Sequence, residues 1–390
     1  MATVLIGCDK FRGSLTAAEA NRAIADGLRL AGFGGVIVER PIADGGEGTL
    51  AAFVAGTPGE LRATEVAGVY GDRIEARWFR SAEGALAVIE AATVVGHDQA
   101  ARHGYRPERA SSAGLGDLIR LAVADGARRI VVGLGGSITT DAGAGLLEAL
   151  GARYADADGR PVERPAGPAL ARIAAIDLSA LPPALADTEI EIASDVGNPL
   201  AGPDGAAAVF GPQKGVAAGD IAAFDAGLAH FDARLAATLR RPPLGERPGA
   251  GAAGGMLIGL AAAARTTVRD GFELIAEATG LFDAVDGADL VVTGEGSLDT
   301  QSLAGKGPVA LARAARARGK PTIAFAGRMV VPFADLKAAG VDAAFALADG
   351  PISLDDALAR GGDLLRDRAA NVFAAMRCGH ALQDRRPLPL

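Results

Sequence analysis

The sequence is poor in the residues on which disulfide-rich and nucleic-acid-binding proteins depend. Its 390 residues include two cysteines, Cys8 and Cys378, which are too few for a disulfide framework and lack metal-ligand spacing. Lys and Arg number 39 against 47 Asp and Glu, which gives a net charge of −8 without a long basic run. The composition therefore excludes a nucleic-acid partner and predicts a reducing compartment, with the cytoplasm as the default.

Long apolar runs are also missing. A spanning helix needs roughly 18 to 20 uncharged apolar residues, and the nearest approach is the stretch from Gly254 to Ala264. Leu5-Ile6-Gly7-Cys8 has the look of a lipoprotein cleavage box, but no basic segment precedes it. We expect this stretch to be a buried strand and the protein to have no membrane partner.

Glycine and apolar residues are what the sequence has in quantity. Apolar residues make up 49% of the chain, which is the composition of a folded globular protein. The 54 glycines cluster in short runs beside Asp, Glu and Ser, without a collagen-like period, and these runs are typical of loops. A length of 390 residues predicts two or three domains.

The hydrophobic pattern predicts an α/β protein. Short β-branched runs alternate with Ala/Leu-rich stretches of helical period at both ends of the chain, whereas Thr64 to Ile89 has short alternating segments typical of an antiparallel meander. We therefore expect two domains. Residues 1–60 plus 286–390 form a discontinuous flavodoxin-like domain with a five-stranded parallel sheet of order 2-1-3-4-5, and residues 61–285 form an inserted mixed α/β domain.

The expected elements can be given by residue number. In the first domain the strands are Thr3–Cys8, Val36–Arg40, Asp289–Thr293, Thr322–Phe325 and Ala343–Leu347. Thr16 and Glu19 form a capping box that predicts a helix from there to about Ala31. In the inserted domain we expect strands at Arg129–Leu134 and Glu189–Ser194, with a helix near Asp141–Leu150 between them.

Polar loops follow the predicted strands at the edge where open α/β sheets bind ligands. In the first domain these loops are Asp9-Lys10-Phe11-Arg12-Gly13-Ser14-Leu15, Ala43-Asp44-Gly45-Gly46-Glu47-Gly48-Thr49 and Gly294-Glu295-Gly296-Ser297-Leu298-Asp299-Thr300. Glycine allows backbone N–H groups to approach a ligand, and carboxylates can hold Mg²⁺ or accept a proton.

The inserted domain has polar loops of its own. They are Gly133-Leu134-Gly135-Gly136-Ser137-Ile138-Thr139-Thr140-Asp141, Ser194-Asp195-Val196-Gly197-Asn198-Pro199-Leu200, Gly211-Pro212-Gln213-Lys214-Gly215 and Gly249 to Gly255. The first of them precedes a predicted helix, whose N–H groups and dipole favour anions. We expect the active site in a cleft between the two domains.

Common catalytic signatures are absent. Gly305-Lys306 is followed by Gly307, so there is no P-loop, and Ile138 stands where a dinucleotide-binding fingerprint needs Gly. The four His residues have neither zinc spacing nor a nucleophile elbow beside them. Metalloprotease and serine hydrolase functions are therefore poorly supported.

The loop motifs resemble those of the bacterial type I glycerate kinase family. The resemblance extends in order through Gly135-Gly136-Ser137, Asp195 to Leu200, Phe210 to Gly215 and Gln301 to Lys306, and covers nearly the whole chain. It implies ATP-dependent phosphorylation of D-glycerate, with 2-phosphoglycerate favoured over 3-phosphoglycerate, and a two-domain architecture. It implies ATP and Mg²⁺ as cofactors and glycerate as the small-molecule partner, and it leaves a homodimer open.

Three positions depart from the family pattern. Arg12 stands where the family usually has Lys, which keeps the charge but changes its geometry. Thr140 and Ala142 replace the usual Asn and Gly on either side of Asp141.

Phosphoryl transfer needs positioning, charge neutralisation and a group that takes the alcohol proton, and we assign candidate roles accordingly. The catalytic candidates are Asp195, Glu295, Lys10 and Arg12, of which Asp195 and Glu295 are also the metal candidates. The nucleotide candidates are Gly135, Gly136, Ser137, Asp141, Gly294, Gly296, Ser297 and Lys306. The substrate candidates are Asp44, Gly45, Gly46, Asn198 and Lys214.

Each candidate also has a structural explanation. Asp9, Asp44 and Asp141 can cap helices or lock turns, and a lone Lys is more often solvated than ligand-bound. Two other functions stay open from the sequence: a kinase for another small hydroxy acid, such as tartronate or a sugar acid, and a non-catalytic regulator that binds a small acid.

Overall fold

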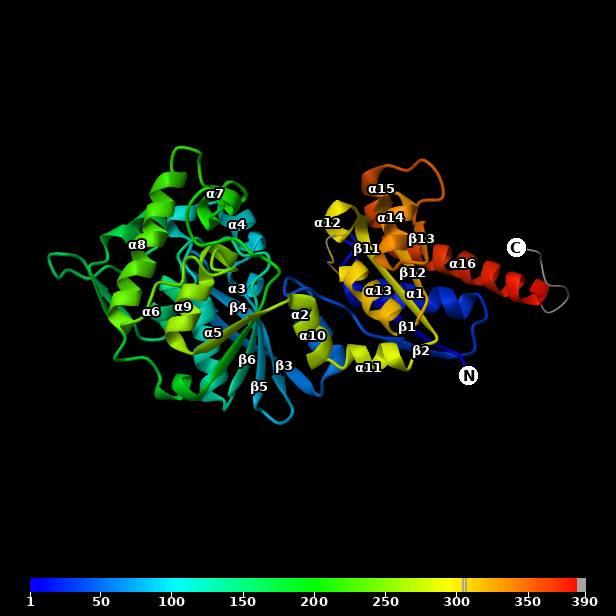
Figure 1. Ribbon diagram of the computed structural model, residues 1–390, viewed down its shortest axis with the longest axis horizontal. Coiled ribbons are helices and arrows are strands. Elements are labelled where there is room, and N and C mark those ends of the chain that lie inside the picture. The colour runs from blue at the N-terminus through cyan, green and yellow to red at the C-terminus, as the bar shows by residue number, and fades with distance from the viewer. Residues whose placement is uncertain (304, 306, 384–390) are drawn as a thin grey trace. The chain divides into compact units, whose positions relative to one another are not determined.

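The computed structural model describes residues 1–303, 305 and 307–383. Its internal contacts divide the chain into two compact units. Unit 1 comprises Met1–Ala43, Ala51–Thr57 and Ile275–Leu390, and unit 2 comprises Asp44–Leu50 and Pro58–Leu274. One unit is built on a parallel sheet and the other on a mixed sheet, so the α/β class predicted from the sequence is confirmed (Figure 1).

Unit 1 contains a five-stranded sheet of order β2-β1-β11-β12-β13, in which all neighbours are parallel. Its strands are β1 (Thr3–Cys8), β2 (Val36–Glu39), β11 (Leu290–Leu298), β12 (Thr322–Met329) and β13 (Ala343–Ala346). Counted along the chain, this is the order 2-1-3-4-5 expected from the sequence. The interior strand β1 is near-continuously apolar because both faces of the sheet are covered.

The helix α1 (Ala17–Leu30) begins where its capping box predicts. Thr16 Oγ1 accepts a hydrogen bond from the Glu19 amide over 3.2 Å, and Glu19 Oε2 accepts one from the Thr16 amide over 2.8 Å. These reciprocal bonds satisfy two donors at the helix N-terminus and fix the end of the preceding loop.

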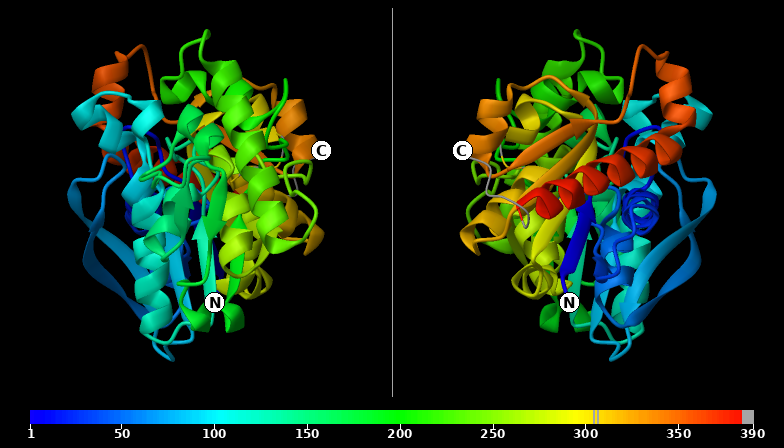
Figure 2. Two further views of the ribbon diagram at one scale, coloured as in Figure 1. Left: turned by 90° about the vertical axis from the view of Figure 1, so that its left-hand side faces the viewer. Right: turned by 90° about the vertical axis from the view of Figure 1, so that its right-hand side faces the viewer.

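Two groups of helices pack on the sheet of unit 1. Besides α1, its helices are α11 (Leu281–Asp286), α12 (Thr300–Leu303), α13 (Gly307–Ala317), α14 (Phe333–Ala339), α15 (Leu354–Ala359) and α16 (Gly361–Gln383). Two more helices, α2 (Thr49–Gly56) and α10 (Gly271–Ala278), have residues in both units. The helices α1 and α16 run side by side, and their apolar residues form one core cluster with β1, β11 and β12 (Figure 2). A second cluster joins α13 and α14 to residues of β11 and β12.

The third strand of unit 1 is longer than the sequence predicts. We expected a strand over Asp289–Thr293 with a loop from Gly294, but β11 continues to Leu298 because β12 also extends, to Met329. Ser297 and Leu298 of β11 pair with Arg328 and Met329 of β12. The motif that begins at Gly294 therefore lies largely within a strand.

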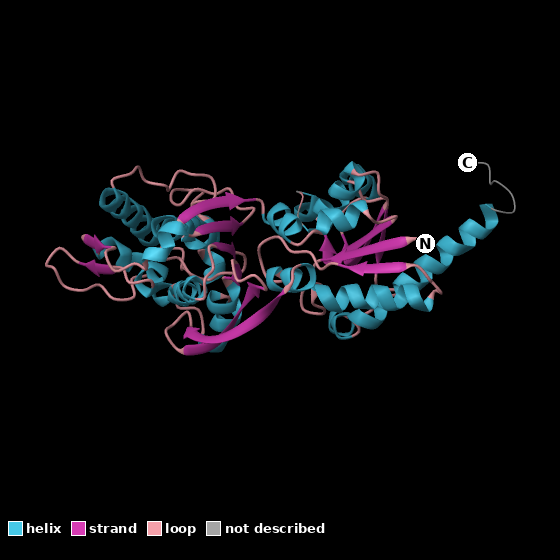
Figure 3. Ribbon diagram, turned by 90° about the horizontal axis from the view of Figure 1, so that it is seen from below, coloured by secondary structure: helices cyan, strands magenta, loops and turns pink. Residues whose placement is uncertain are grey.

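Unit 2 contains a six-stranded mixed sheet of order β10-β9-β6-β5-β4-β3. The strands are β3 (Gly59–Ala67), β4 (Arg73–Ser81), β5 (Leu86–Glu90), β6 (Arg129–Gly133), β9 (Glu189–Ala193) and β10 (Arg265–Arg269). The segment β3-β4-β5 is antiparallel, as expected from its alternating pattern, and β5, β6, β9 and β10 are parallel. A small antiparallel pair, β7 (Arg153–Ala155) and β8 (Ala175–Asp177), was not expected (Figure 3).

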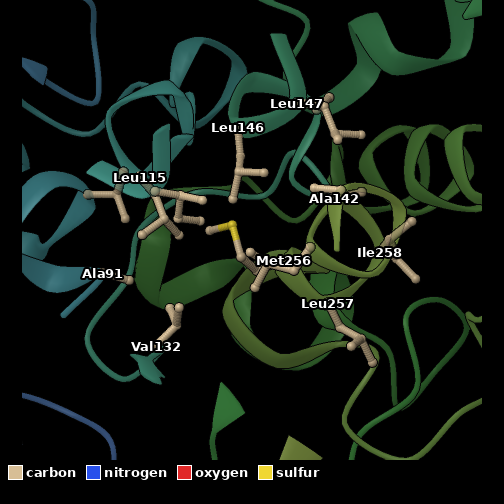
Figure 4. Close-up of a cluster of buried hydrophobic side chains, with 14 of the residues drawn as sticks. Ala91, Leu115, Val132, Ala142, Leu146, Leu147, Met256, Leu257 and Ile258 are labelled. Atoms are coloured by element: carbon tan, nitrogen blue, oxygen red, sulfur yellow. The ribbon is translucent and has the colours of Figure 1, made fainter. Parts of the chain in front are cut away.

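One large apolar core supports the sheet of unit 2. The helices of this unit are α3 (Ala92–Val95), α4 (His97–His103), α5 (Ala113–Ala124), α6 (Ala144–Ala149), α7 (Ala206–Phe210), α8 (Ile221–Leu239) and α9 (Met256–Ala263). Leu115 of α5, Leu146 of α6 and Met256 of α9 are fully buried and lie in one cluster, with Met256 near its centre (Figure 4). This packing holds the segments that follow β6 and β9.

The unit boundaries differ from the predicted ones at residues 60/61 and 285/286. Residues 44–50 belong to unit 2, and residues 275–285 belong to unit 1. The second difference has a local cause: Gly56 packs against Thr279, and Thr57 Oγ1 donates a hydrogen bond to the Ala278 carbonyl over 3.2 Å. Within the described part of the chain, no helix has the length and apolarity that crossing a membrane requires.

Candidate functional site

The parallel strands of unit 2 end in register at one edge of the sheet. Glu90, Gly133, Ala193 and Arg269 are successive pairing partners at the carboxyl ends of β5, β6, β9 and β10. The segments that follow these residues, including Gly135 and Asp195, therefore start from a common edge. This is where open α/β sheets bind their ligands.

The loop formed by residues 44–50 packs backbone to backbone on this edge. The Gly135 amide donates a hydrogen bond to the Gly45 carbonyl over 3.0 Å. A Cβ on Gly45 would lie 2.4 Å from the Ala193 carbonyl oxygen, and one on Gly135 would lie 2.6 Å from the Gly46 Cα. Such a close approach is open only to glycine. We expected this loop in the first domain, and these contacts place it in unit 2 instead.

Glu90 holds the same loop, although the sequence analysis did not single it out. Its Oε1 accepts hydrogen bonds from the amides of Gly48 and Leu50 over 3.0 and 2.7 Å. Because these amides lie at the start of α2, the carboxylate satisfies donors at a helix N-terminus. The sequence feature that could have pointed to Glu90 is an acidic residue at the end of an otherwise apolar strand.

Asp195 follows β9 and is exposed. Its Oδ1 accepts a hydrogen bond from the Gly271 amide over 3.4 Å, at the start of α10. Gly271 also packs directly on the Asp44 backbone, where an added Cβ would lie 1.9 Å from the Asp44 carbonyl oxygen. Two predicted candidates, Asp44 and Asp195, are therefore brought together through a glycine that the sequence analysis missed.

The segment from Gly135 to Asp141 is exposed only at its start. Gly135 and Gly136 are exposed, Ser137 is 6% exposed, and the residues from Ile138 to Asp141 are at most 1% exposed. The helix expected from Asp141 begins at Ala144. The motif thus exposes backbone to a ligand only at Gly135 and Gly136, and of these the Gly135 amide already donates to the Gly45 carbonyl.

Asp141 occupies the place that we expected a phosphate to take. Its carboxylate accepts hydrogen bonds from the Ser112 amide and hydroxyl, both over 2.7 Å, and from the amides of Gly143 and Gly145 at the start of α6. Burial raises the pKa of Asp141, and these hydrogen bonds oppose the rise. The group that satisfies this buried helix N-terminus is therefore the protein's own carboxyl group.

The departures beside Asp141 lie in tight backbone. Ala142 has a φ of +51°, which is the left-handed region that favours glycine. This backbone conformation explains why the family usually has Gly at this position. The Thr140 hydroxyl is buried and has no hydrogen-bond partner within the described ranges.

Asn198 and Lys214 both make internal contacts. Asn198 Nδ2 donates to the Asp204 carbonyl over 2.9 Å, so its side chain closes the loop after β9. Lys214 is 3% exposed, and its Nζ donates to the Thr139 carbonyl over 2.8 Å. Neither contact involves the exposed part of the edge, although both residues were predicted to bind substrate.

In unit 1 the first and third motifs lie side by side. The Asp9 amide donates to the Gly294 carbonyl over 2.9 Å, and a Cβ on Gly296 would lie 3.0 Å from the Arg12 amide nitrogen. The Phe11 ring packs against Gly294, because a Cβ added to Gly294 would lie 3.1 Å from the ring. Lys10, Arg12 and Glu295 therefore extend from neighbouring segments at the carboxyl edge of this sheet, where β1 and β11 pair.

Ser297 supplies a further polar group at this edge. Its Oγ is buried and has no hydrogen-bond partner among the residues that the structure describes, which is the state of a hydroxyl that a ligand can satisfy. Its carbonyl accepts a hydrogen bond from Ser302 Oγ over 3.3 Å. Lys306, which was also predicted to bind the nucleotide, lies outside the described residues.

The described residues contain no cluster of three or more His, Cys, Asp or Glu side chains that could hold a metal ion. A Mg²⁺ ion does not require such a cluster, because it is commonly held by one or two carboxylates together with substrate phosphates. Each unit by itself has groups that could contact phosphate: exposed glycine backbone in unit 2, and the Ser297 hydroxyl with the side chains of Lys10 and Arg12 in unit 1.

Comparison with known proteins is consistent across the chain. Residues 4–377 match the Glycerate kinase family. The chain is 38% identical over 376 residues to a glycerate kinase of Halalkalibacterium halodurans, covering 95% of this chain and 97% of the relative. It is 36% identical over 376 residues to the glycerate 2-kinase of Escherichia coli, covering 96% and 98%.

A solved structure agrees with these sequence matches. The crystal structure of a putative glycerate kinase 2 from Salmonella typhimurium LT2 superposes with a TM-score of 0.85 at 37% identity, and the match covers 97% of this chain and 99% of that one. With a family match that extends over nearly its full length and relatives above one third identity, the chain belongs to the glycerate kinase family.

Proposed function

We propose that this protein catalyses the ATP-dependent phosphorylation of D-glycerate and that 2-phosphoglycerate is the favoured product. The observation that carries the proposal is the 36–38% identity to curated glycerate kinases over nearly the full length of both chains. The preference for the 2-position is supported by the relative from Escherichia coli that is named glycerate 2-kinase.

The reaction joins a glycerate hydroxyl oxygen to the γ-phosphorus of ATP and breaks the bond between that phosphorus and the oxygen of ADP. The hydroxyl proton must pass to a base, and the developing charge on the phosphoryl oxygens must be neutralised. Little covalent chemistry is required of the protein, so the residues act by positioning and by electrostatics.

In unit 2 we assign the role of proton acceptor to Asp195. Its carboxylate is exposed, and the hydrogen bond from the Gly271 amide orients it at the edge of the sheet. Gly45, Gly46 and Asp44 beside it are candidates for glycerate contact, and the exposed backbone at Gly135 and Gly136 is a candidate for phosphate contact through the Gly136 amide. Asn198 shapes the loop that carries Asp195.

In unit 1 we assign phosphate and carboxylate recognition to Lys10 and Arg12, and nucleotide contact to Gly294, Gly296 and Ser297. The buried Ser297 hydroxyl supports this assignment because it lacks a partner among the described residues. Lys306 stays a candidate on sequence grounds alone.

Mg²⁺ would bind together with the phosphates of ATP. The candidate ligands are Asp195 in unit 2 and Glu295 in unit 1, and either one would supply one carboxylate oxygen. Bound there, the ion would neutralise charge on the transferred phosphoryl group. We further propose that unit 1 is a flavodoxin-like domain, supported by its strand order, and that unit 2 is an insertion between the second and third strands of its sheet.

Two further proposals concern the setting of the enzyme. A cytoplasmic location is supported by the shortage of cysteine in the sequence. A homodimer is a separate prediction, which light scattering on the purified protein would test.

The substrate assignment is tested by steady-state ADP release from the full chain with MgATP and a panel of hydroxy acids: D-glycerate, L-glycerate, tartronate and a sugar acid. D-glycerate is expected to have the highest kcat/KM. A higher kcat/KM for tartronate or the sugar acid would replace the proposed substrate, and tight binding without ADP release would favour a non-catalytic binding protein.

A further inference from the structure

Lys214 ends a short 3-10 turn, Pro212–Lys214, inside unit 2. The turn is closed by hydrogen bonds from the Lys214 amide to the Gly211 carbonyl and from the Gly215 amide to the Pro212 carbonyl, and Gly215 has a φ of +88°. This geometry directs a long cationic side chain into the core, where it is only 3% exposed. A lysine is almost never buried to this extent without a specific partner.

The partner is the Thr139 carbonyl, to which Nζ donates over 2.8 Å. The same carbonyl is confined from the other side, because a Cβ on Gly254 would lie 2.1 Å from its oxygen. The neighbouring Thr140 carbonyl accepts a hydrogen bond from the Gly167 amide over 3.1 Å. Lys214 is therefore one of several groups that fix the backbone at Thr139 and Thr140.

The pKa of Lys214 reflects its burial. Burial lowers the pKa of Lys214 to about 8, while attraction by Asp141 opposes the decrease. Asp141 is itself fully buried and bonded to the starts of α5 and α6. A cation kept here at neutral pH thus has a carboxylate near it and a carbonyl in contact with it.

The backbone that Lys214 holds leads directly to the exposed glycines. Thr139 is two residues after Ser137, and the Ile138 amide between them donates to the Val95 carbonyl over 2.8 Å. Four residues before Thr139, the Gly135 amide is bonded to the Gly45 carbonyl. The contact between Lys214 and the Thr139 carbonyl is therefore one of three anchors along the segment that begins at Gly135 and Gly136.

We propose that Lys214 is a positioning residue for the Gly135–Gly136 backbone and does not bind glycerate itself. This inference rests on the proposed function in so far as that backbone binds the phosphates of ATP. The segment from Phe210 to Gly215 then has an internal role, because it fixes the loop that follows β6 from the side of the core.

The test compares the full-length protein with Lys214→Met, which keeps an unbranched side chain that is one atom shorter and removes the charge and the donor. Amide hydrogen exchange of residues 135–140 is measured first, without ligand. We expect exchange there to be at least ~10-fold faster in Lys214→Met, while exchange within α8 stays unchanged, since local opening can be separated from global unfolding. The melting temperature should stay within a few degrees, because an apolar side chain of similar size is tolerated where a charge was buried.

Steady-state kinetics supply a second readout. Loss of loop order should raise the KM for ATP at least ~10-fold, with a smaller effect on kcat and on the KM for glycerate. Leu235→Val, at a buried position of α8, is the control for general destabilisation and should change neither loop exchange nor the KM for ATP.

The outcomes separate the explanations. A higher KM for glycerate with unchanged loop exchange would show Lys214 to be a substrate ligand and would overturn the proposal. Equal exchange in both proteins at residues 135–140 would overturn it as well. If the wild-type protein had no glycerate-dependent activity, the proposed function would fail, and the exchange measurement would still decide whether Lys214 positions the loop.

Discussion

The Gly135 amide donates a hydrogen bond to the Gly45 carbonyl over 3.0 Å, and this contact joins two motifs that are 90 residues apart in the sequence. Gly45 has a φ of +92°, and a Cβ added to it would lie 2.4 Å from the Ala193 carbonyl oxygen. The contact thus depends on the absence of a side chain at Gly45.

Gly45→Ala should therefore disrupt the edge of the sheet in unit 2. Left-handed strain costs roughly 1 to 2 kcal/mol and overpacking about 1 to 3 kcal/mol, so we expect the free energy of unfolding to fall by at least about 2 kcal/mol. Kinase activity should fall with it. Chemical denaturation and the kinase assay measure the two effects.

Gly197→Ala is the matched control, because Gly197 has open space around its Cβ position and no positive φ. It should change the free energy of unfolding by no more than about 0.5 kcal/mol. Equal stability of the Gly45 and Gly197 variants would contradict the packing argument.

Asp195→Asn tests whether the charge of Asp195 takes part in the reaction. The Asn side-chain oxygen can still accept the hydrogen bond from the Gly271 amide, so the melting temperature should stay near that of the wild type. If Asp195 accepts the substrate proton or binds Mg²⁺, kcat should fall at least ~100-fold. Asp204→Asn, an exposed carboxylate nearby in the sequence, should leave kcat unchanged. Activity of Asp195→Asn within a few-fold of wild type would reduce Asp195 to a turn residue.

Arg12 tests the departure from the usual family lysine. The side chain is exposed, so substitutions should leave the stability nearly unchanged. Arg12→Lys should retain activity within a few-fold because it keeps the positive charge. Arg12→Gln should raise the KM for ATP or glycerate at least ~10-fold, since an uncharged side chain cannot neutralise phosphate or carboxylate. Equal kinetics of the Gln and Lys variants would contradict a role for the charge.

Lys214 should also give the stability an alkaline pH dependence. Its pKa is about 8 in the folded protein against 10.5 as the ordinary value, so below pH 8 both folded and unfolded states carry the proton. Between about pH 8 and 10.5 the unfolded chain binds more protons than the folded one, and the free energy of unfolding therefore rises with pH in this window.

The corresponding measurement is the difference in unfolding free energy between wild type and Lys214→Met from pH 7 to 10. The difference should shift in favour of the wild type by roughly 2 to 3 kcal/mol across the full window. A difference that is constant with pH would mean that Lys214 keeps its ordinary pKa.

The sequence predicted those parts of the fold that depend on local pattern. Thr16 and Glu19 mark the start of α1 by their own chemistry, and the apolar run Thr3–Cys8 is a strand with the expected bounds. Even the order of the five strands in unit 1 could be inferred, because parallel α/β connections allow few alternatives.

The errors arose where distant pairing decides the structure. The motif at Gly294 has the composition of a loop, yet β11 extends through it because Ser297 and Leu298 find partners in β12. The loop at Gly45 was assigned to the first domain by its place in the sequence, while its contacts with Gly135 and Ala193 place it in unit 2. In both cases contacts between segments that are distant in the sequence decide the structure, and local sequence pattern does not.

The candidate site was predictable by residue type and only partly by role. Asp195 and Gly135 do follow the carboxyl ends of neighbouring parallel strands, as predicted from their place after strands in the sequence. The burial of Asp141 could not be inferred, because a capping carboxylate and a ligand carboxylate have the same sequence pattern. The burial of Lys214 could not be inferred either, because its partner, the Thr139 carbonyl, is distant in the sequence.

The most direct test of the proposed reaction is phosphorus NMR of the product formed from D-glycerate and MgATP by the purified full-length protein. We predict one new phosphomonoester whose phosphorus signal is split into a doublet by the single proton on C2, with ADP formed in equal amount. A triplet from coupling to the two protons on C3 would contradict the preference for the 2-position. No phosphomonoester, or only inorganic phosphate, would contradict the assignment of this protein as a glycerate kinase.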